Sequence, residues 1–314
     1  MIDPQVQALF DTCNWVQTGS APLAGDASAR RYVRSINGDA SAILMIDPTG
    51  SVPSFLKMAA HLQKIGLRPP EIWAADEKAG LILMEDLGDG LLAKIVADDP
   101  DQEIPLYRAA VDVLLHLRGQ PVPEDIKKYG PQEMADAISP AFEWYAAGQN
   151  GSDASALFQE ALQYLSPESD TLLLRDYHAE NLIWQAPNMR LLDFQDAVAG
   201  HPAYDLVSLL QDARRCVSAE CIRATTAYYL RETGDDPDTF TAACAVQAAQ
   251  RNLRILGIFA RLSKQGKKHY VDLIPRVWSY LTDNLSHPEL ARLRAHLMTV
   301  LPEPDTAHLN RLKA

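Results

Sequence analysis

The residues of this chain that are best suited to chemistry lie between positions 174 and 196. Asp176 is followed five residues later by Asn181, and after a further strand-sized run by Asp193. Phosphoryl transfer from ATP needs a carboxylate that accepts or orients the proton of the attacking hydroxyl, and hard oxygen ligands that hold Mg²⁺ against the triphosphate. A turn residue is the ordinary interpretation of each side chain alone. The three together, in this order between apolar runs, favour a phosphotransferase site.

Short apolar runs must position these residues. The runs 171–174, 182–184 and 190–192 are typical of buried strands, here set among helices. The spacing D-x-x-x-x-N, then a strand and D-F, predicts that all three polar residues meet at one end of a short hairpin. Helical spacing from Tyr107 to Leu117, and again from about Phe240 to Lys264, predicts a mostly helical region around them.

The chain has a different character before residue 90. Strand-like runs at 32–36, 42–46 and 81–84 surround one helical pattern, which extends from Phe55 to Ile65 and is followed by a glycine and two prolines. The sequence therefore predicts an α+β protein with a small β-rich lobe, residues 1–87, and a larger mainly helical lobe, residues 88–314.

Composition and charge limit the class of protein. A chain of 314 residues corresponds to roughly two domains, and 47% hydrophobic with 22% charged residues is typical of a globular protein. A formal net charge of −12 makes nucleic acid or an anionic membrane surface a poor partner. No apolar run is long enough to span a membrane, the start is not signal-like, and the four cysteines form no metal or disulfide pattern. We expect a cytoplasmic protein, a monomer or weak dimer.

Three segments carry a resemblance to a known family. Residues 173–181, 191–196 and 201–206 resemble the aminoglycoside phosphotransferase and choline kinase superfamily, whose members are relatives of the protein kinases. The resemblance implies a two-lobed, protein-kinase-like fold that uses ATP and Mg²⁺. It also implies that the N-terminal lobe binds the nucleotide and ends in a hinge, and that the C-terminal lobe carries the catalytic loop and the acceptor site.

The resemblance assigns roles to individual residues. Asp176 matches the catalytic base, and Asn181 and Asp193 match the metal ligands. His178 matches a histidine common in the catalytic loop, and Asp205 matches a buried acid that braces this loop through backbone amides. The alternative for Asp205 is an N-cap, because a helical run follows it.

The sequence departs from the family pattern at several positions. Leu174 stands where relatives carry the histidine of the H-x-D pattern, and Gln195 replaces the glycine of Asp-Phe-Gly. Kinases usually hold the α- and β-phosphates with a lysine on the third strand, paired with a glutamate on the next helix. The strand at 42–47 has no lysine and the following helix has no glutamate. The loss of both favours a different phosphate clamp.

The candidate clamp is the turn and strand at 25–32, which takes the place of the kinase phosphate-covering loop. Ser28, Arg30 and Arg31 are its candidate phosphate contacts, because small residues allow close backbone approach and guanidinium groups pair with phosphate oxygens. Successive strand residues point to opposite faces, so only one arginine can face the nucleotide. Two exposed surface arginines are the alternative.

The run 83–88 resembles the hinge of the family. Backbone groups of Glu85 and Leu87 would pair with the adenine ring. A strand that ends in an acidic turn is the simpler interpretation, and both can hold.

Within the superfamily, residues 25–34, 175–181 and 251–261 resemble bacterial anomeric kinases that phosphorylate N-acetylmuramate and N-acetylglucosamine at the 1-hydroxyl during cell-wall recycling. Arg175 and Arg254 are the candidate substrate contacts, the second on the long helix that usually shapes the acceptor pocket; an arginine on a solvated helix face is the alternative. Two other functions remain open: an aminoglycoside O-phosphotransferase, and a pseudokinase that binds nucleotide as a regulatory module. The preference for ATP over GTP is also open.

Overall fold

The computed structural model describes residues 2–23 and 29–314, so Ser28 and residues 25–27 of the expected turn lie outside the described residues. The chain divides into two compact units. The first contains Met1–Pro100 and Glu180–Ala197, and the second contains Asp101–Ala179 and Val198–Ala314. Strands dominate the first and helices the second, which confirms the predicted α+β class. The expected division at residue 87 differs, because residues 88–100 and the predicted metal-ligand segment belong to the first unit.

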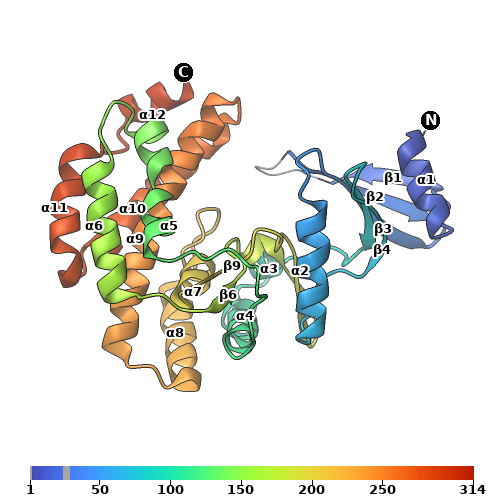
Figure 1. Cartoon of the computed structure of the whole chain (residues 1–314), viewed down its shortest axis with the longest axis horizontal. Coiled ribbons are helices and arrows are strands. Elements are labelled where there is room, and N and C mark those ends of the chain that lie inside the picture. The colour runs from blue at the N-terminus through green and yellow to red at the C-terminus, as the bar shows by residue number, and fades with distance from the viewer. Residues whose placement is uncertain (1, 24–28) are drawn as a thin grey trace. The chain divides into compact units, whose positions relative to one another are not determined.

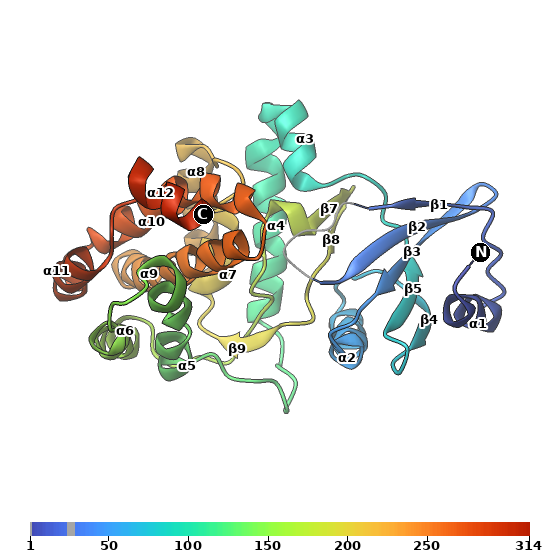
Figure 2. The same cartoon turned by 90° about the horizontal axis from the view of Figure 1, so that it is seen from above.

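A five-stranded antiparallel sheet forms the body of the first unit, in the order β1-β2-β3-β5-β4 (Figure 2). Val33, Leu44 and Leu83 lie opposite one another on adjacent strands and form an apolar row across the sheet. The bounds are β1, Gly19–Pro22; β2, Arg31–Asn37; β3, Ala40–Ile46; β4, Ile72–Asp76; and β5, Leu81–Glu85.

Two helices cover opposite faces of this sheet (Figure 2). Helix α1, Pro4–Thr12, begins after Asp3, whose carboxylate accepts the Gln5 N–H at 2.8 Å, and its apolar face packs on the Val33 row. Helix α2, Val52–Lys64, buries an apolar stripe and ends just before Gly66, which has φ +86°. The predicted strands at 32–36, 42–46 and 81–84 and the predicted helix at 55–65 are all present.

A short hairpin later in the chain completes the first unit. Its strands are β7, Leu182–Gln185, and β8, Asn188–Leu191, and the residues paired at its base are Leu182 and Leu191. The Trp184 N–H donates to the Gly90 carbonyl at 2.8 Å, just ahead of helix α3, Leu92–Asp98. A Cβ atom at Gly90 would lie 2.9 Å from the Trp184 carbonyl oxygen, so this close approach requires glycine.

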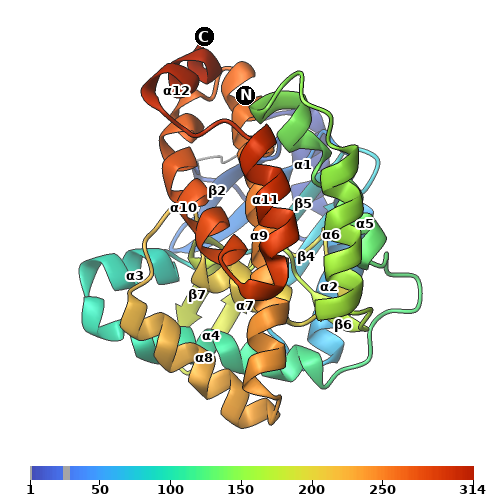
Figure 3. The same cartoon turned by 90° about the vertical axis from the view of Figure 1, so that its left-hand side faces the viewer.

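The second unit is built around one long buried helix, α9, Pro237–Lys264 (Figures 1 and 3). Asp236 caps it by accepting the Thr239 N–H at 2.9 Å. A Cβ at Gly257 would lie 2.1 Å from the Pro140 carbonyl carbon, so the turn at 140–145 packs directly on the α9 backbone. Other helices of this unit are α4, Glu103–Arg118; α5, Pro131–Asp136; α6, Ser152–Leu165; α8, Ala219–Thr233; α10, Ile274–Leu285; α11, Ala291–Val300; and α12, Thr306–Lys313.

A two-stranded sheet and a short helix form the buried, mainly apolar part of the second unit that holds the loop after residue 173. Strand β6, Thr171–Leu173, pairs with β9, Val198–Gly200, and the chain then enters α7, Ala203–Leu210. This topology places the segment after β6 beside the start of α7. Among the described residues, no helix is both long enough and apolar enough to cross a membrane.

Candidate active site

The hairpin of the first unit brings the two predicted metal ligands together. Asn181 directly precedes β7 and Asp193 lies two residues beyond β8, so both lie at the open end of the hairpin. The Leu192 N–H donates to the Asn181 carbonyl at 2.9 Å, which extends the pairing to the residue before Asp193. The spacing between Asn181 and Asp193 in the sequence therefore corresponds to one hairpin, with the two residues at its open end.

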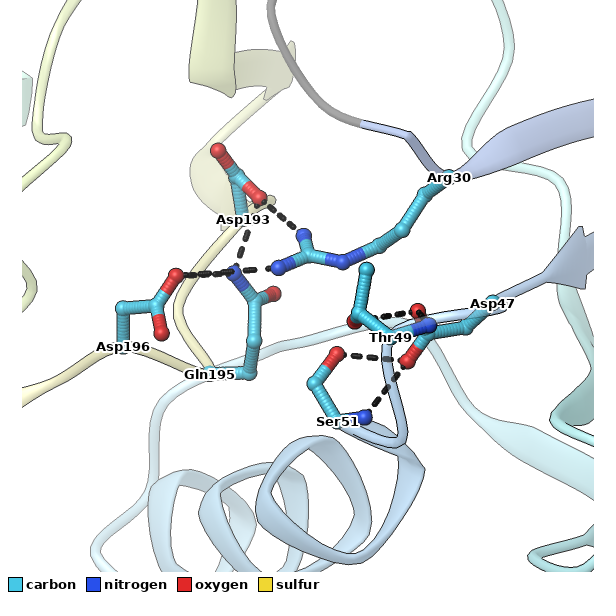
Figure 4. Close-up of polar contacts among 7 residues, drawn as sticks. All are labelled: Arg30, Asp47, Thr49, Ser51, Asp193, Gln195 and Asp196. Carbon is cyan, nitrogen blue, oxygen red and sulfur yellow. Dashed lines mark hydrogen bonds and ion pairs between the residues drawn. The ribbon is translucent and has the colours of Figure 1, made fainter.

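Asp193 has an unusual backbone and a defined set of partners. Its φ is +53°, in the left-handed region that costs a non-glycine residue about 1 kcal/mol or more. The Arg30 guanidinium donates to Asp193 Oδ1 at 2.8 Å, and the Gln195 side-chain amide donates to the same oxygen at 3.0 Å (Figure 4). Phe194, fully buried, packs at a tilt against Phe55 of α2 with 4.8 Å between ring centres. The carboxylate is thus positioned by its own neighbours on both sides.

The two arginines of the predicted phosphate clamp differ in environment. The Arg30 side chain is only 9% exposed and also lies 3.6 Å from Asp196, whereas Arg31 is exposed at the start of β2. Burial alone would lower the pKa of Arg30, but Tyr32 and Asp193 outweigh it and raise the pKa. Arg30 is therefore the arginine that lies at the metal-ligand segment.

A tight polar turn precedes α2 in the same unit (Figure 4). Asp47, 3% exposed, accepts hydrogen bonds from the backbone and hydroxyl of Thr49 and from the backbone and hydroxyl of Ser51. Burial would raise the pKa of Asp47, but these donors lower it. The turn fixes the start of α2, the helix that carries Phe55, whose ring packs against Phe194.

The predicted hinge is held by one ion pair and several hydrogen bonds. The Glu85 carboxylate accepts from Arg190 of β8 at 3.1 Å, and Arg190 also donates to the carbonyls of Arg68 and Pro69. The Glu85 N–H donates to the Glu71 carbonyl, and the Leu87 carbonyl accepts the side-chain amide of Gln185 at 2.9 Å. The first unit thus ties the hinge to the hairpin that carries the metal ligands.

A second arginine fixes the residues that follow the hinge strand. Arg34 of β2 donates to Asp86 at 3.2 Å and to Asp89 at 2.8 Å, and Asp86 also accepts the Gly88 N–H at 2.9 Å. Asp86 is only 6% exposed. Burial would raise the pKa of Asp86, but its hydrogen bonds and Arg34 lower it.

The loop that contains Asp176 belongs to the second unit and is braced from α7. The Asp205 carboxylate accepts the Leu174 N–H at 2.6 Å and the Arg175 N–H at 2.9 Å. Asp205 lies inside the first turn of α7, whose N-cap position is Pro202, so it is not the N-cap. Burial raises the pKa of Asp205 to about 7 against the opposing effect of its two backbone donors. Arg175 has φ +68°, so the residue before Asp176 is also left-handed.

The rest of this loop is buried. Tyr177 donates its hydroxyl proton to the Ala110 carbonyl of α4 at 2.7 Å, and His178 is 5% exposed. Burial lowers the pKa of His178, which favours the neutral ring, although Asp212 and Asp176 act in the opposite direction. Tyr177 and His178 are therefore suited to supporting the loop from inside the protein.

The two predicted acceptor arginines meet around a pair of tyrosines. The Arg175 guanidinium lies 5.3 Å from the ring centre of Tyr129, which packs edge-on against Tyr204 at 5.6 Å. Arg254 of α9 is half-buried. Burial would lower the pKa of Arg254, but Tyr204, Tyr129 and Asp176 raise it. Two permanent positive charges and two aromatic rings therefore lie in the part of the unit that contains Asp176.

Several site residues escape the sequence argument. Arg251 donates to the Ser208 hydroxyl at 2.9 Å, which in turn donates to the Arg175 carbonyl at 3.3 Å. Asp212, 1% exposed, has one carboxylate oxygen without a hydrogen-bond partner in the part of the chain that is described. For Asp212 the signal in the sequence was the run Gln-Asp-Ala-Arg-Arg at the end of an apolar helix, and for Arg251 it was the similarity of residues 251–261 to the helix that shapes the acceptor pocket in the family.

The donor set suits a magnesium ion that is held partly by its nucleotide. Within 2–23 and 29–314, no group of three or more His, Cys, Asp or Glu side chains could hold a metal by itself. Mg²⁺ in nucleotide enzymes is bound through one or two protein oxygens together with phosphate oxygens and water. The carboxylate of Asp193 and the amide oxygen of Asn181 fit this pattern, and a cationic group already lies on that carboxylate.

The sequence model of the phosphotransferase enzyme family matches residues 20–241. The chain belongs to this family. It is 36% identical to an N-acetylmuramate/N-acetylglucosamine kinase of Caulobacter vibrioides, over 89% of this chain and 91% of that protein. It is 28% identical to a protein of the same name from Pseudomonas aeruginosa, over 96% of this chain and 95% of the relative.

Solved structures confirm the protein-kinase-like fold of the choline kinase and aminoglycoside phosphotransferase group. The choline kinase LicA of Streptococcus pneumoniae superposes with a TM-score of 0.65 at 13% identity, over 90% of this chain and all of that one. The streptomycin-ATP-APH(2'')-IIa ternary complex superposes with a TM-score of 0.60 at 12% identity, over 81% and 90% of the two chains. The predicted family resemblance is confirmed.

Proposed function

We propose that this chain is an ATP-dependent kinase that phosphorylates N-acetylmuramate and N-acetylglucosamine at the anomeric 1-hydroxyl, a reaction of cell-wall recycling. The observation that carries the proposal is the alignment with the Caulobacter kinase over nine-tenths of both chains. Within this chain, a braced loop around Asp176 and a hairpin that ends at Asn181 and Asp193 supply the parts that phosphoryl transfer requires.

Asp176 is the proposed catalytic base. Its carboxylate accepts the proton of the anomeric hydroxyl as the sugar oxygen attacks the γ-phosphorus, the bond to the β-phosphate oxygen breaks, and ADP leaves. Asp205 holds the preceding backbone through two N–H groups, which fixes the direction of the Asp176 side chain. Asp205 and the buried His178 are thus positioning residues of the loop.

Asn181 and Asp193 would hold the Mg²⁺ through an amide and a carboxylate oxygen. When bound, the ion neutralises negative charge on the phosphate oxygens. Arg30 is the proposed replacement for the kinase lysine, because it is the largely buried cation at Asp193. For adenine, the Glu85 N–H and the Leu87 carbonyl already have partners, so the ring would pair with the Glu85 carbonyl and the Leu87 N–H.

The acceptor side favours a neutral or anionic sugar over a polycationic drug. Arg175 and Arg254 carry positive charge, and the buried Tyr129 and Tyr204 pack beside them and support them. N-acetylmuramate bears a lactyl carboxylate that a guanidinium can bind with two hydrogen bonds. An aminoglycoside, with several ammonium groups, would meet two like charges.

A turnover assay with three acceptors tests the proposal. ATP, Mg²⁺ and the purified chain are incubated in parallel with N-acetylmuramate, N-acetylglucosamine and kanamycin. We expect ADP formation with the two amino sugars and none above background with kanamycin. Turnover of kanamycin alone would identify an aminoglycoside phosphotransferase, and nucleotide binding without turnover of any acceptor would identify a pseudokinase.

Cytoplasmic location and a monomeric or weakly dimeric state remain predictions.

A further inference from the structure

One carboxylate of the proposed metal site is already neutralised by the protein. Arg30 donates to Asp193 Oδ1 at 2.8 Å, and its second terminal nitrogen lies 3.6 Å from Asp196 Oδ2 (Figure 4). The Gln195 amide donates to both acids, at 3.0 Å and 3.1 Å. A charged donor and a neutral donor therefore share the two carboxylates.

The burial of the members of this cluster is uneven. The Arg30 side chain is 9% exposed, whereas the side chains of Asp193 and Asp196 are 37% and 54% exposed. The arginine is thus held on the protein side of the carboxylates, and their other side is open to solvent. A cation arriving from solution can reach Asp193, but it meets Arg30 as a like charge on the same oxygen.

This arrangement makes the metal alone and the metal with its nucleotide different ligands. A bare Mg²⁺ at Asp193 would lie close to the guanidinium, and repulsion between like charges at hydrogen-bond distances is strong where water is partly excluded. A metal–nucleotide complex brings phosphate oxygens with it, and these are good bidentate partners for a guanidinium. The nucleotide would therefore give Arg30 a new partner at the moment the metal takes its old one.

We propose that Arg30 occupies the Asp193 carboxylate as a stand-in cation until Mg²⁺–nucleotide binds, and that its transfer to the phosphates makes metal binding depend on nucleotide. The proposal rests on the proposed function, because it takes Asp193 as a metal ligand. Gln195, at the position where relatives carry glycine, keeps Asp193 and Asp196 bridged by a neutral donor when the arginine moves away.

The test is a pair of titrations on the full chain, with Arg30→Ala compared with the parent. Mn²⁺ serves as the probe, and the free ion is measured by its electron paramagnetic resonance signal without nucleotide and again with saturating ADP. We expect Arg30→Ala to bind Mn²⁺ alone about fivefold tighter or more, and to bind Mn²⁺–ADP about fivefold weaker or more, as expected for coupling between two sites. Arg31→Ala, one residue away and exposed, is the matched control and should change neither value.

The exchange predicts that Arg30→Ala changes the two affinities in opposite directions, tighter for Mn²⁺ alone and weaker for Mn²⁺–ADP. If Arg30→Ala weakens both, Arg30 only supports the fold of the site; if it changes neither, Arg30 is a surface ion pair. Either result overturns the proposal. Arg30→Lys covers the case in which the alanine variant does not fold: a lysine cannot form the forked pairing, so both values should shift in the same two directions by less, and parental values for both would also contradict the exchange.

The acceptor assay separates this proposal from the proposed function. The titrations contain no sugar, so the two proposals can fail separately. If the parent phosphorylates no amino sugar but Arg30→Ala still shows the two opposite shifts, the proposed function is wrong and the exchange stands. If the parent phosphorylates amino sugars but Arg30→Ala does not show the opposite shifts, the proposed function stands and the exchange is wrong.

Discussion

The two segments that carry the proposed chemistry share one backbone peculiarity but are held in opposite ways. Of the non-glycine residues that the structure describes, three have left-handed φ values: Asn14, Arg175 and Asp193. The backbone at Arg175 is held by a fully buried carboxylate through two backbone N–H groups. Asp193 is held by side chains that meet it at a partly exposed surface. The base loop is thus built on fixed bonds, and the metal segment on bonds that can exchange partners.

The largest effect should come from the base itself. Asp176→Asn keeps the size of the side chain and removes its ability to accept a proton. We expect kcat with N-acetylglucosamine to fall by roughly 10²–10⁴, the usual scale for losing a positioned acid–base group. Nucleotide affinity, measured by isothermal titration with ADP and Mg²⁺, should stay within about twofold of the parent. Near-normal turnover would remove Asp176 from this role.

Asp205→Ala should break the fixed bonds and reduce stability strongly. Two buried N–H groups would lose their acceptor, and each unsatisfied group costs about 1–3 kcal/mol. We expect the free energy of unfolding, from urea denaturation, to fall by about 2–5 kcal/mol, together with loss of turnover. Asp205→Asn retains one acceptor oxygen and should give a smaller loss. A fall of less than about 1 kcal/mol for the alanine variant would mean that the brace is not needed.

Arg254→Ala should separate the two sugars. The lost guanidinium is the expected partner of the lactyl carboxylate, so kcat/KM for N-acetylmuramate should fall about tenfold more than kcat/KM for N-acetylglucosamine. Steady-state rates with each sugar at saturating ATP measure the difference. Equal losses with both sugars would place Arg254 at a feature that the sugars share, and no loss with either would remove it from the acceptor site.

The smallest effect on stability is expected at the exchangeable region. The carboxylate partners of Arg30 are 37% and 54% exposed, and ion pairs of this kind contribute about 0–1 kcal/mol. Urea denaturation of Arg30→Ala without nucleotide should therefore give a free energy of unfolding within about 1 kcal/mol of the parent. If the free energy of unfolding fell as much as it does for Asp205→Ala, the segment at Asp193 would be held as firmly as the loop at Asp176, and the contrast between them would be wrong.

Local sequence patterns predicted the fold of the central elements well. Apolar runs gave β3 and β5, and the spacing around Asn181 and Asp193 gave the hairpin and its open end. The edge strands β1, Gly-Ser-Ala-Pro, and β4, Ile-Trp-Ala-Ala-Asp, were missed because they are short and show no clear alternation. Sheet pairing, which no local pattern encodes, makes them strands.

The candidate site was predictable only where its parts are close in sequence. Strand alternation requires that Arg30 and Arg31 face opposite sides, but which one lies at Asp193 depends on the whole sheet. Gln195 looked like a departure from the family pattern, and only its position between two carboxylates gives it a role. Tyr129 and Tyr204 come together through the packing of distant segments, so their contact had no signal in the sequence.

The most direct test of the proposed reaction is the structure of its product. The chain is incubated with ATP, Mg²⁺ and N-acetylglucosamine or N-acetylmuramate, and the sugar phosphate is examined by phosphorus-31 nuclear magnetic resonance with coupling to protons. We predict one sugar phosphate signal, coupled to the anomeric proton, with either sugar, and at least about a hundredfold less of it from Asp176→Asn after the same short incubation. Phosphate on any other hydroxyl, or no sugar phosphate from a parent chain that binds Mg²⁺–ATP, would contradict the assignment.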